Sequence, residues 1–331
     1  MASRPQRVQF SSYTRDRVSG IRNQESVECG LRVICPCRRQ RSYLGTPLAT
    51  CNSEPGQTPA LRLILDIRHL IPELEVRSRL PARPTRKPPL LFVHGGYADA
   101  WCWEPFFLPW FASQGWPAHA LSLRGHGTSA GADALFIAGL DDYVADVEHV
   151  ASQFEAAPVL IGHSMGAAVL ERMMATRPVR GAALMAPVPP TGLLPVAARL
   201  ATSHPNYASH MIGLDPTRLS SDILKALRPF YFSREVDPAI LREAMLHLNQ
   251  ESPRVLFDLS MRLHWIEPQA SSPVFVLGAA ADQIAIPADV EATARHHGVG
   301  PAILPGMGHM LMLEPGWRTA AQAIADWADA L

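Results

Sequence analysis

Lysine is nearly missing from this chain of 331 residues, since only Lys87 and Lys225 occur among 30 basic residues. Thirty acidic residues balance them, which leaves a formal net charge of zero. A neutral chain has no long-range field that would gather nucleic acid or an anionic membrane. No apolar run approaches the roughly 20 residues needed to cross a bilayer. No signal-like apolar segment follows Arg4 and Arg7. The sequence predicts a cytoplasmic protein that binds no nucleic acid and does not span a membrane.

Cysteine is scarce and unevenly placed. Four of the five cysteines fall in the first sixty residues, namely Cys29, Cys35, Cys37 and Cys51. A zinc site is one interpretation, but Cys35-x-Cys37 departs from the usual ligand spacing and no matching pair follows it. We favour unpaired thiols in a reducing compartment, and we expect neither a metal nor a cofactor.

Regular periodicity is absent from residues 1–60. This stretch carries nine arginines against four acidic residues and shows neither a helical nor a strand period. It predicts a flexible basic extension. An organelle-targeting peptide is the alternative, although Glu25 and Glu28 weaken it.

The chain from residue 61 onward has a different texture. Residues 61–67 and 74–80 are expected to be two strands with a turn signal, Ile71-Pro72, between them. Six short apolar runs are expected to be further strands: 90–93, 118–123, 158–161, 182–185, 274–277 and 302–304. Helical patterns lie between the later ones, at 103–113, 139–154, 165–176, 287–297 and 315–330. This alternation predicts an α/β core over residues 61–186 and 273–331, with a mostly parallel sheet and helices on both faces.

One long stretch breaks the alternation. Residues 187–272 contain only helical patterns, at 193–203, 216–228, 238–248 and 253–265. A connection of this length is too long for an ordinary loop inside a compact domain. We therefore expect an inserted helical cap over residues 187–272.

The strongest local motif is Gly162-His-Ser-Met-Gly166, a G-x-S-x-G pattern. A buried-strand run ends just before it at Ile161, and a helical run begins at Met165. This strand–turn–helix context is that of a nucleophile elbow, in which a strained turn raises Ser164 above the sheet at a helix N-terminus. Glycines allow the strand and the helix to approach each other closely.

An activated serine needs a base and a group that orients the base. Asp282 and His309 each come directly after a strand-like run, in the order Ser, Asp, His. The carboxyl ends of parallel strands are where open α/β sheets place their sites. We expect His309 to take the proton of Ser164 and Asp282 to fix the imidazole tautomer. The strand-like run 89–93 is followed directly by a His-Gly-Gly turn. A backbone N–H of this turn and that of Met165 are candidate donors to the oxyanion.

These segments resemble the α/β-hydrolase fold superfamily, and most of all its small esterase and lysophospholipase branch with a helical cap. The motifs that carry the resemblance are Val93-His-Gly-Gly, Ser122–Ser129, Gly162–Gly166, Gly278-x₃-Asp282 and Gly306-Met-Gly-His309. The resemblance covers residues 61–331. It implies an eight-stranded sheet, a catalytic triad of Ser164, Asp282 and His309, and an oxyanion hole formed by the backbones of Gly96 and Met165. It also implies that His126 is structural.

Departures from the family pattern narrow the branch. The His94-Gly-Gly-Tyr97 turn lacks the Pro-Gly of proline iminopeptidases, and a serine at 164 argues against epoxide hydrolases and haloalkane dehalogenases, which need a carboxylate nucleophile. Trp101 and Trp103 follow the turn, as in plant esterases and hydroxynitrile lyases. The resemblance implies that the lyases use a lysine in the pocket, but neither Lys87 nor Lys225 lies at a motif. An esterase is therefore favoured over a lyase.

The expected substrate is a small to medium, largely apolar carboxylic ester, cleaved through an acyl-enzyme. The candidate pocket residues are Tyr97, Trp101, Met211, Phe230, Tyr231 and Met245. A C–C bond hydrolase or thioesterase with the same triad stays open, as does a non-catalytic ligand receptor on this fold. The sequence leaves the oligomeric state and the natural substrate undetermined.

Overall fold

The computed structural model describes residues 72–205, 221–262 and 272–331, all of which belong to one compact unit, Gln57–Leu331. The extension expected over residues 1–60 and the strand expected over residues 61–67 lie outside the described residues. So do the four cysteines that precede Cys102, and Met211 of the predicted pocket.

A seven-stranded sheet forms the centre of the described chain. Its strands are β1 (Val76–Arg79), β2 (Leu90–Val93), β3 (Ala118–Leu121), β4 (Val159–His163), β5 (Ala182–Met185), β6 (Val274–Ala279) and β7 (Pro301–Leu304). They lie in the order β1-β3-β2-β4-β5-β6-β7, and only the pair β1–β3 is antiparallel. The predicted α/β fold with a mostly parallel sheet is confirmed, with seven of the eight expected strands in the described residues.

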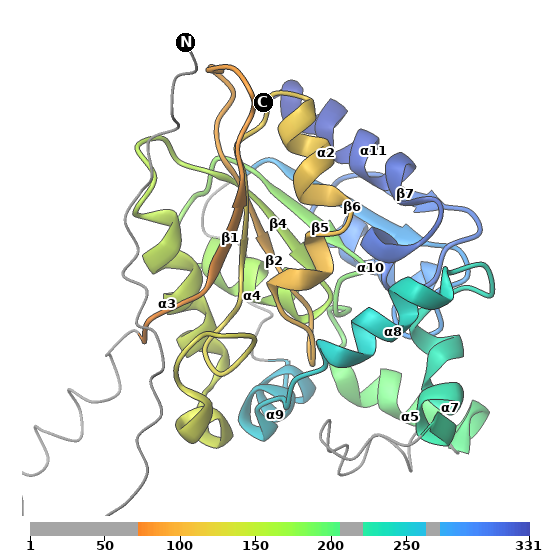
Figure 1. The fold of residues 1–331 in the computed structure, drawn as a ribbon. Helices are drawn as coiled ribbons and strands as arrows, with labels where there is room; N and C mark the ends of the chain where they lie inside the picture. The colour runs from red at the N-terminus through yellow and green to blue at the C-terminus, as the bar shows by residue number, and fades with distance from the viewer. Residues whose placement is uncertain (1–71, 206–220, 263–271) are drawn as a thin grey trace, which may run out of the picture. The chain divides into compact units, whose positions relative to one another are not determined.

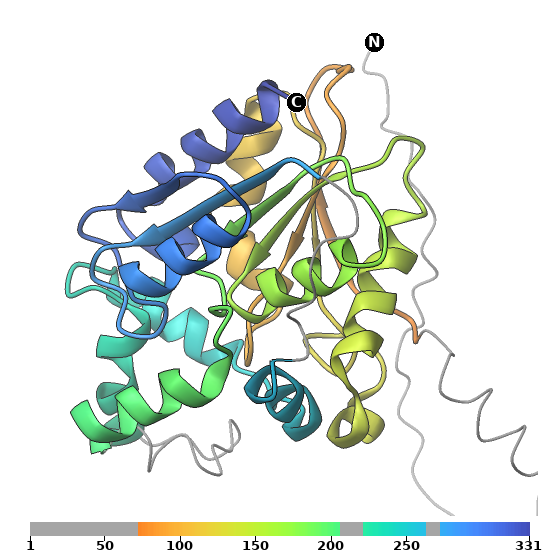
Figure 2. The ribbon, with the colours of Figure 1, turned by 180° about the vertical axis from the view of Figure 1, so that it is seen from behind.

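Helices cover both faces of this sheet. The longer ones are α2 (Phe107–Ser113), α3 (Leu140–Ala151), α4 (Met165–Met174), α10 (Pro287–His296) and α11 (Trp317–Asp329), and the short 3₁₀ helices are η1 (Ala100–Trp103), η2 (Ala132–Ile137) and η4 (Leu311–Leu313). Figure 1 shows α2 and α11 on one face, and the reverse view in Figure 2 brings α3, α4 and α10 to the front. Because both faces are covered, strands such as β2 are apolar at every position rather than at alternate ones.

The two faces of β2 show this directly. Leu90 and Phe92 belong to one apolar cluster, and Leu91 and Val93 belong to the other. Phe92 also holds the segment that follows the strand, since its ring centroid lies 5.0 Å from that of Trp103. Burying a side chain of this size contributes about 1.5–3 kcal/mol. This packing therefore stabilises the end of β2 and the segment that follows it.

Between β5 and β6 the described residues contain helices and no strand. These are α5 (Leu193–Ser203), α7 (Ser221–Tyr231), α8 (Pro238–Leu246) and α9 (Pro253–Ser260), which we call the helical segment. Figures 1 and 2 agree that they gather at one end of the sheet. Local sequence explains their starts: Asp237 and Ser252 cap α8 and α9 through their side chains, and each is followed by a proline at the first helical position.

Candidate active site

The turn between β4 and α4 is strained in the way an elbow requires. Ser164 has φ 51° and ψ −114°, a region that non-glycine residues rarely occupy, and its backbone N–H donates to the Met185 carbonyl at 2.9 Å. The neighbouring glycines have no room for a side chain. A Cβ at Gly162 would lie 2.6 Å from the Gly166 carbonyl oxygen, and one at Gly166 would lie 2.5 Å from the His94 carbonyl oxygen. The strand, the helix and the end of β2 are therefore in backbone contact around Ser164.

His309 and Asp282 meet after β7 and β6. The His309 Nδ1 lies 2.8 Å from Asp282 Oδ2, and both side chains are buried. The other oxygen, Asp282 Oδ1, accepts the N–H groups of Ile284 at 2.7 Å and Ala285 at 3.0 Å. A carboxylate only accepts hydrogen bonds, so the ring proton sits on Nδ1 and leaves His309 Nε2 as the basic nitrogen.

Ser164 is partly exposed, while His309 is only 3% exposed. No hydrogen bond joins Ser164 Oγ to His309 Nε2 in the part of the chain that the structure describes. The two residues are linked through His163, which immediately precedes the serine and donates from Nε2 to the His309 carbonyl at 2.9 Å. Catalytic hydrogen bonds are often long before substrate binds.

A second imidazole therefore lies beside the predicted base. The ring centroids of His163 and His309 are 4.7 Å apart. Complete burial, together with the neighbouring His309, holds the pKa of His163 well below its ordinary value. His163 stays neutral, so it orients the His309 backbone without placing a positive charge against the base.

The His94-Gly95-Gly96 turn lies directly on the elbow. A Cβ at Gly95 would be 3.1 Å from the Cβ of Ser164, and one at Gly96 would be 3.9 Å from Met165 Sδ. Met165 is the first residue of α4, so its N–H has no partner within the helix. The two predicted oxyanion donors, the backbones of Gly96 and Met165, thus belong to adjoining segments beside the serine.

A buried carboxylate, which the sequence did not single out, supports this turn from the helical segment. Glu251 Oε2 accepts the N–H of Tyr97 at 3.2 Å, and a Cβ at Gly96 would lie 3.5 Å from the same oxygen. Its Oε1 accepts the Tyr143 hydroxyl at 2.7 Å and the Ser252 N–H at 2.7 Å. The neighbouring Asn249 N–H donates to the Tyr97 carbonyl at 2.8 Å, which gives the turn a second tie.

His126 completes this cluster as the charge partner of Glu251. Its Nε2 lies 3.3 Å from Glu251 Oε2 and its Nδ1 lies 3.0 Å from the Arg124 carbonyl, so both ring nitrogens face acceptors. Burial alone would lower the pKa of His126, but the Glu251 carboxylate and these hydrogen bonds outweigh it and raise that pKa above 6.5. Burial would likewise raise the pKa of Glu251, yet the His126 charge and the donors around the carboxylate lower it below 4.5. The pair is ionic.

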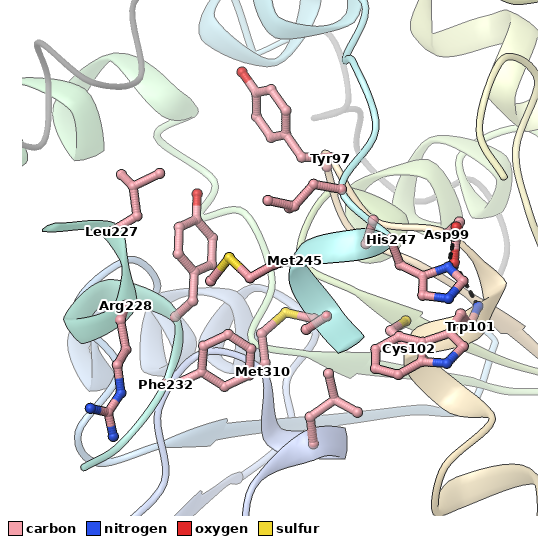
Figure 3. A pocket seen from close by; sticks show the side chains of 16 residues that line it. Tyr97, Asp99, Trp101, Cys102, Leu227, Arg228, Phe232, Met245, His247 and Met310 are labelled. Carbon is pink, nitrogen blue, oxygen red and sulfur yellow. Dashed lines mark hydrogen bonds and ion pairs between the residues drawn. The ribbon is translucent and has the colours of Figure 1, made fainter. Parts of the chain in front are cut away.

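A pocket lies beside the turn. Its lining consists of Gly96, Tyr97, Ala98, Asp99, Trp101, Cys102, Leu227, Arg228, Tyr231, Phe232, Ala244, Met245, His247, Leu248, Met310 and Leu313. Figure 3 shows Leu227, Arg228 and Phe232 on one side of it and Asp99, Trp101 and Cys102 on the other. Four of the predicted residues therefore lie together in the lining, namely Tyr97, Trp101, Tyr231 and Met245.

Phe230 lies elsewhere. It packs into a separate apolar cluster with Val196, Leu200 and Leu227, and its ring centroid is 4.9 Å from that of His204. The physical reason is helical geometry, because consecutive residues of α7 point about 100° apart. With Tyr231 in the pocket lining, Phe230 packs among the helices instead.

Within residues 72–205, 221–262 and 272–331, no group of three or more His, Cys, Asp or Glu side chains could hold a metal ion. Over the same residues, no helix has the length and apolar character needed to cross a bilayer.

Residues 90–324 match the alpha/beta hydrolase family. The chain belongs to this family. Solved structures of similar fold include an esterase from Thermogutta terrifontis, with 20% identity, a TM-score of 0.59 and coverage of 78% of this chain and 93% of that one. A bromoperoxidase from Bacillus anthracis has 15% identity and a TM-score of 0.59, with 77% and 95% covered. A monoacylglycerol lipase from Paleococcus ferrophilus has 22% identity and a TM-score of 0.52, with 77% and 98% covered. No curated protein matches the chain.

Membership of the alpha/beta hydrolase family supports a hydrolase activity, but it does not select a substrate. The three structural neighbours have the names of an esterase, a lipase and a peroxidase. A common fold hosts different chemistries through differences in its site. The substrate and the reaction must therefore be inferred from the residues of this site.

Proposed function

We propose that this alpha/beta hydrolase is a serine hydrolase that cleaves a small to medium, largely apolar carboxylic ester through an acyl-enzyme. The observation that carries the proposal is the pairing of a strained, partly exposed serine on an elbow with a buried His309–Asp282 hydrogen bond of 2.8 Å behind it. The apolar lining of the adjoining pocket supports an uncharged substrate over a peptide or a phosphoester.

In the first half-reaction, Ser164 Oγ attacks the ester carbonyl carbon while His309 Nε2 takes the hydroxyl proton. Asp282 keeps the imidazole in the required tautomer and stabilises the imidazolium. The backbone N–H groups of Gly96 and Met165 donate to the oxyanion, and donors of this kind are typically worth about 3–4 kcal/mol of transition-state stabilisation. His309 then protonates the leaving alcohol.

In the second half-reaction, water attacks the acyl-serine and gives its proton to His309. Collapse of the second tetrahedral intermediate releases the carboxylic acid and returns the proton to Ser164. We further propose that residues 187–272 act as a cap over this edge of the core. The ties from Asn249 and Glu251 to Tyr97 support this placement.

Active-site labelling tests the proposal. A fluorophosphonate should label the wild-type chain stoichiometrically at Ser164 and should not label Ser164→Ala. Ser113, which is exposed in α2, provides the matched control, because Ser113→Ala should label like the wild type. Wild-type chain should also hydrolyse p-nitrophenyl butyrate, and Asp282→Asn should lower kcat by about 10⁴.

The same assay separates the alternatives. If the chain prefers an acyl-CoA to the simple ester, the bond that it cleaves is a thioester. If it prefers a vinylogous diketone, that bond is a C–C bond. Absence of both labelling and turnover would contradict a catalytic role for Ser164. Tight ligand binding that Ser164→Ala leaves unchanged would then indicate a receptor.

A further inference from the structure

One wall of the pocket holds an imidazole for which the proposed reaction has no use. His247 follows α8 and lines the pocket on the same side as Asp99 and Trp101, as Figure 3 shows. The residues that perform the proposed chemistry, Ser164, Asp282 and His309, are outside this lining. His247 is therefore placed to contact a part of the substrate other than the bond that is cleaved.

Two contacts fix the ring of His247. Its plane lies nearly parallel to the ring of Trp101, with centroids 4.6 Å apart and an interplanar angle of 4°. Its Nδ1 lies 3.1 Å from Asp99 Oδ2, and the Asp99 side chain is 4% exposed. Asp99 is itself held, because Oδ1 accepts the Trp101 N–H at 2.8 Å and Oδ2 accepts Asn249 Nδ2 at 3.4 Å. Stacking sets the plane of the imidazole, and the carboxylate sets its rotation.

The carboxylate also sets the tautomer. Because Asp99 accepts hydrogen bonds, it favours the tautomer of His247 with the proton on Nδ1, and in that tautomer Nε2 is an acceptor. Within the described residues, Nε2 has no hydrogen-bond partner, and the His247 side chain is 28% exposed. The pocket therefore offers a fixed acceptor with an unused lone pair.

Most of the remaining lining is apolar. It includes Ala98, Leu227, Phe232, Ala244, Met245, Leu248, Met310 and Leu313. The guanidinium of Arg228 is turned in part toward the backbone, since its Nη2 donates to the Arg234 carbonyl at 2.9 Å. Complete burial raises the pKa of the Cys102 thiol well above its ordinary value, so Cys102 stays protonated. The lining also contains Tyr97 and Tyr231. Pockets of this kind orient a ligand through a few well-placed polar groups, of which His247 Nε2 is one whose position is fixed.

We propose that His247 is a specificity-determining residue, which accepts a hydrogen bond from a hydroxyl group on an otherwise apolar ester substrate. The flat stacked pair of His247 and Trp101 favours a planar group beside it, so we expect an aromatic ring that bears the hydroxyl. This inference rests on the proposed ester hydrolysis and names the class of ester.

A set of matched esters tests it. We would measure kcat/KM for p-nitrophenyl 3-phenylpropanoate and for its meta-hydroxy, para-hydroxy and para-fluoro derivatives. The ratio of each derivative to the parent ester is the readout, because it cancels effects on the reacting bond. Wild-type chain should prefer at least one hydroxy ester to the parent by about tenfold, mostly through KM, whereas the fluoro ester should show no such preference.

His247→Phe keeps a flat ring that can stack on Trp101 but removes the acceptor nitrogen. In this variant the hydroxy-to-parent ratio should fall to about one. Leu246→Gln changes the adjacent residue, which is 77% exposed and outside the lining, and should keep the wild-type ratio. An unchanged ratio in His247→Phe would overturn the proposal.

The wild-type measurement is decisive even if His247→Phe does not fold. Turnover of the parent ester without a preference for either hydroxy ester would overturn the role of His247 and leave the proposed function standing. If no ester of the set is turned over and Ser164 is not labelled, the proposed function itself fails.

Discussion

The two sides of the candidate site are held by different physical means. On the core side, Ser164, Asp282 and His309 follow β4, β6 and β7, and the backbones around the elbow touch where glycines leave room. Every residue of β4 is buried, as are the last four residues of β6 and the last residue of β7, between two apolar clusters. Their positions are consequently set by close packing, which tolerates little change in volume.

On the helical side the contacts with the turn after β2 are polar. Helix α8 has no fully buried residue, and Leu246 and Phe257 are among the large apolar side chains left exposed. The connection from α8 to α9 is tied to the core through His247, Asn249 and Glu251, each by hydrogen bonds to the turn after β2 or to residues near it. From this comparison we expect substitutions that change side-chain volume to destabilise the core side. Substitutions that change a charge should destabilise the helical side.

Gly166→Ala tests the core side and should have the largest effect. The new Cβ would lie 2.5 Å from the carbonyl oxygens of both Val93 and His94, and neither backbone can move without displacing β2. We expect a loss of about 3 kcal/mol in the free energy of unfolding. A shift of the elbow by about 1 Å should also lower kcat/KM by about 100-fold. Urea unfolding and ester hydrolysis measure the two effects.

Gly300→Ala is the matched control for this substitution. No atom lies within 4 Å of the place its Cβ would take. The free energy of unfolding should change by less than about 0.5 kcal/mol. Equal losses in the two variants would contradict the claim that backbone contact at the elbow is what matters.

Glu251→Gln tests the helical side with almost no change in volume. It removes the charge that balances His126 and weakens the acceptor for Tyr97 N–H. We expect a loss of about 2 kcal/mol, below the 3–5 kcal/mol typical of a broken buried pair, because His126 can lose its proton. A tenfold fall in kcat should accompany it if the turn positions the oxyanion donor. Glu243→Gln on the exposed face of α8 is the control.

The pH dependence of stability gives a smaller and more specific signal. The pKa of Glu251 is lowered from 4.5, so its contribution is present above pH 4.5 and is lost as the pH falls through the lowered value. The pKa of His126 is raised from 6.5, so its contribution is present below pH 6.5 and is lost as the pH rises through the raised value. The difference in Tm between the wild type and Glu251→Gln should therefore be largest between about pH 4.5 and 6.5. A difference that does not vary from pH 3.5 to 9 would contradict an ionic pair.

The same division explains what the sequence could predict. Strands β2 to β7 could be predicted because each lies in a short apolar run, and the elbow could be predicted because G-x-S-x-G stands between such a run and a helical pattern. Asp282 and His309 could be placed because parallel strands end at one edge of the sheet. Their mutual hydrogen bond follows from topology, and the structure has it.

Glu251 and His247 carry no comparable local signal. Glu251 lies in the polar stretch Leu248-Asn-Gln-Glu-Ser252, which has the composition of an exposed loop. Its partners Tyr97 and Tyr143 are 154 and 108 residues away in the chain. Asp99 likewise meets His247 across 148 residues. Only the fold brings such groups together, so no spacing rule could have indicated them.

Phe257→Ser provides the smallest expected effect and the last test of the comparison. Phe257 is 57% exposed on α9, whereas Leu259, two residues later in the same helix, is 1% exposed within the core cluster that contains α3 and α4. If polar ties and one buried stripe hold α9, the outward face contributes nothing, and the free energy of unfolding should change by less than about 0.5 kcal/mol. A loss above about 1 kcal/mol would mean that apolar contacts on the outer face also hold α9, and the contrast between the two sides of the site would then be weaker than the contacts indicate.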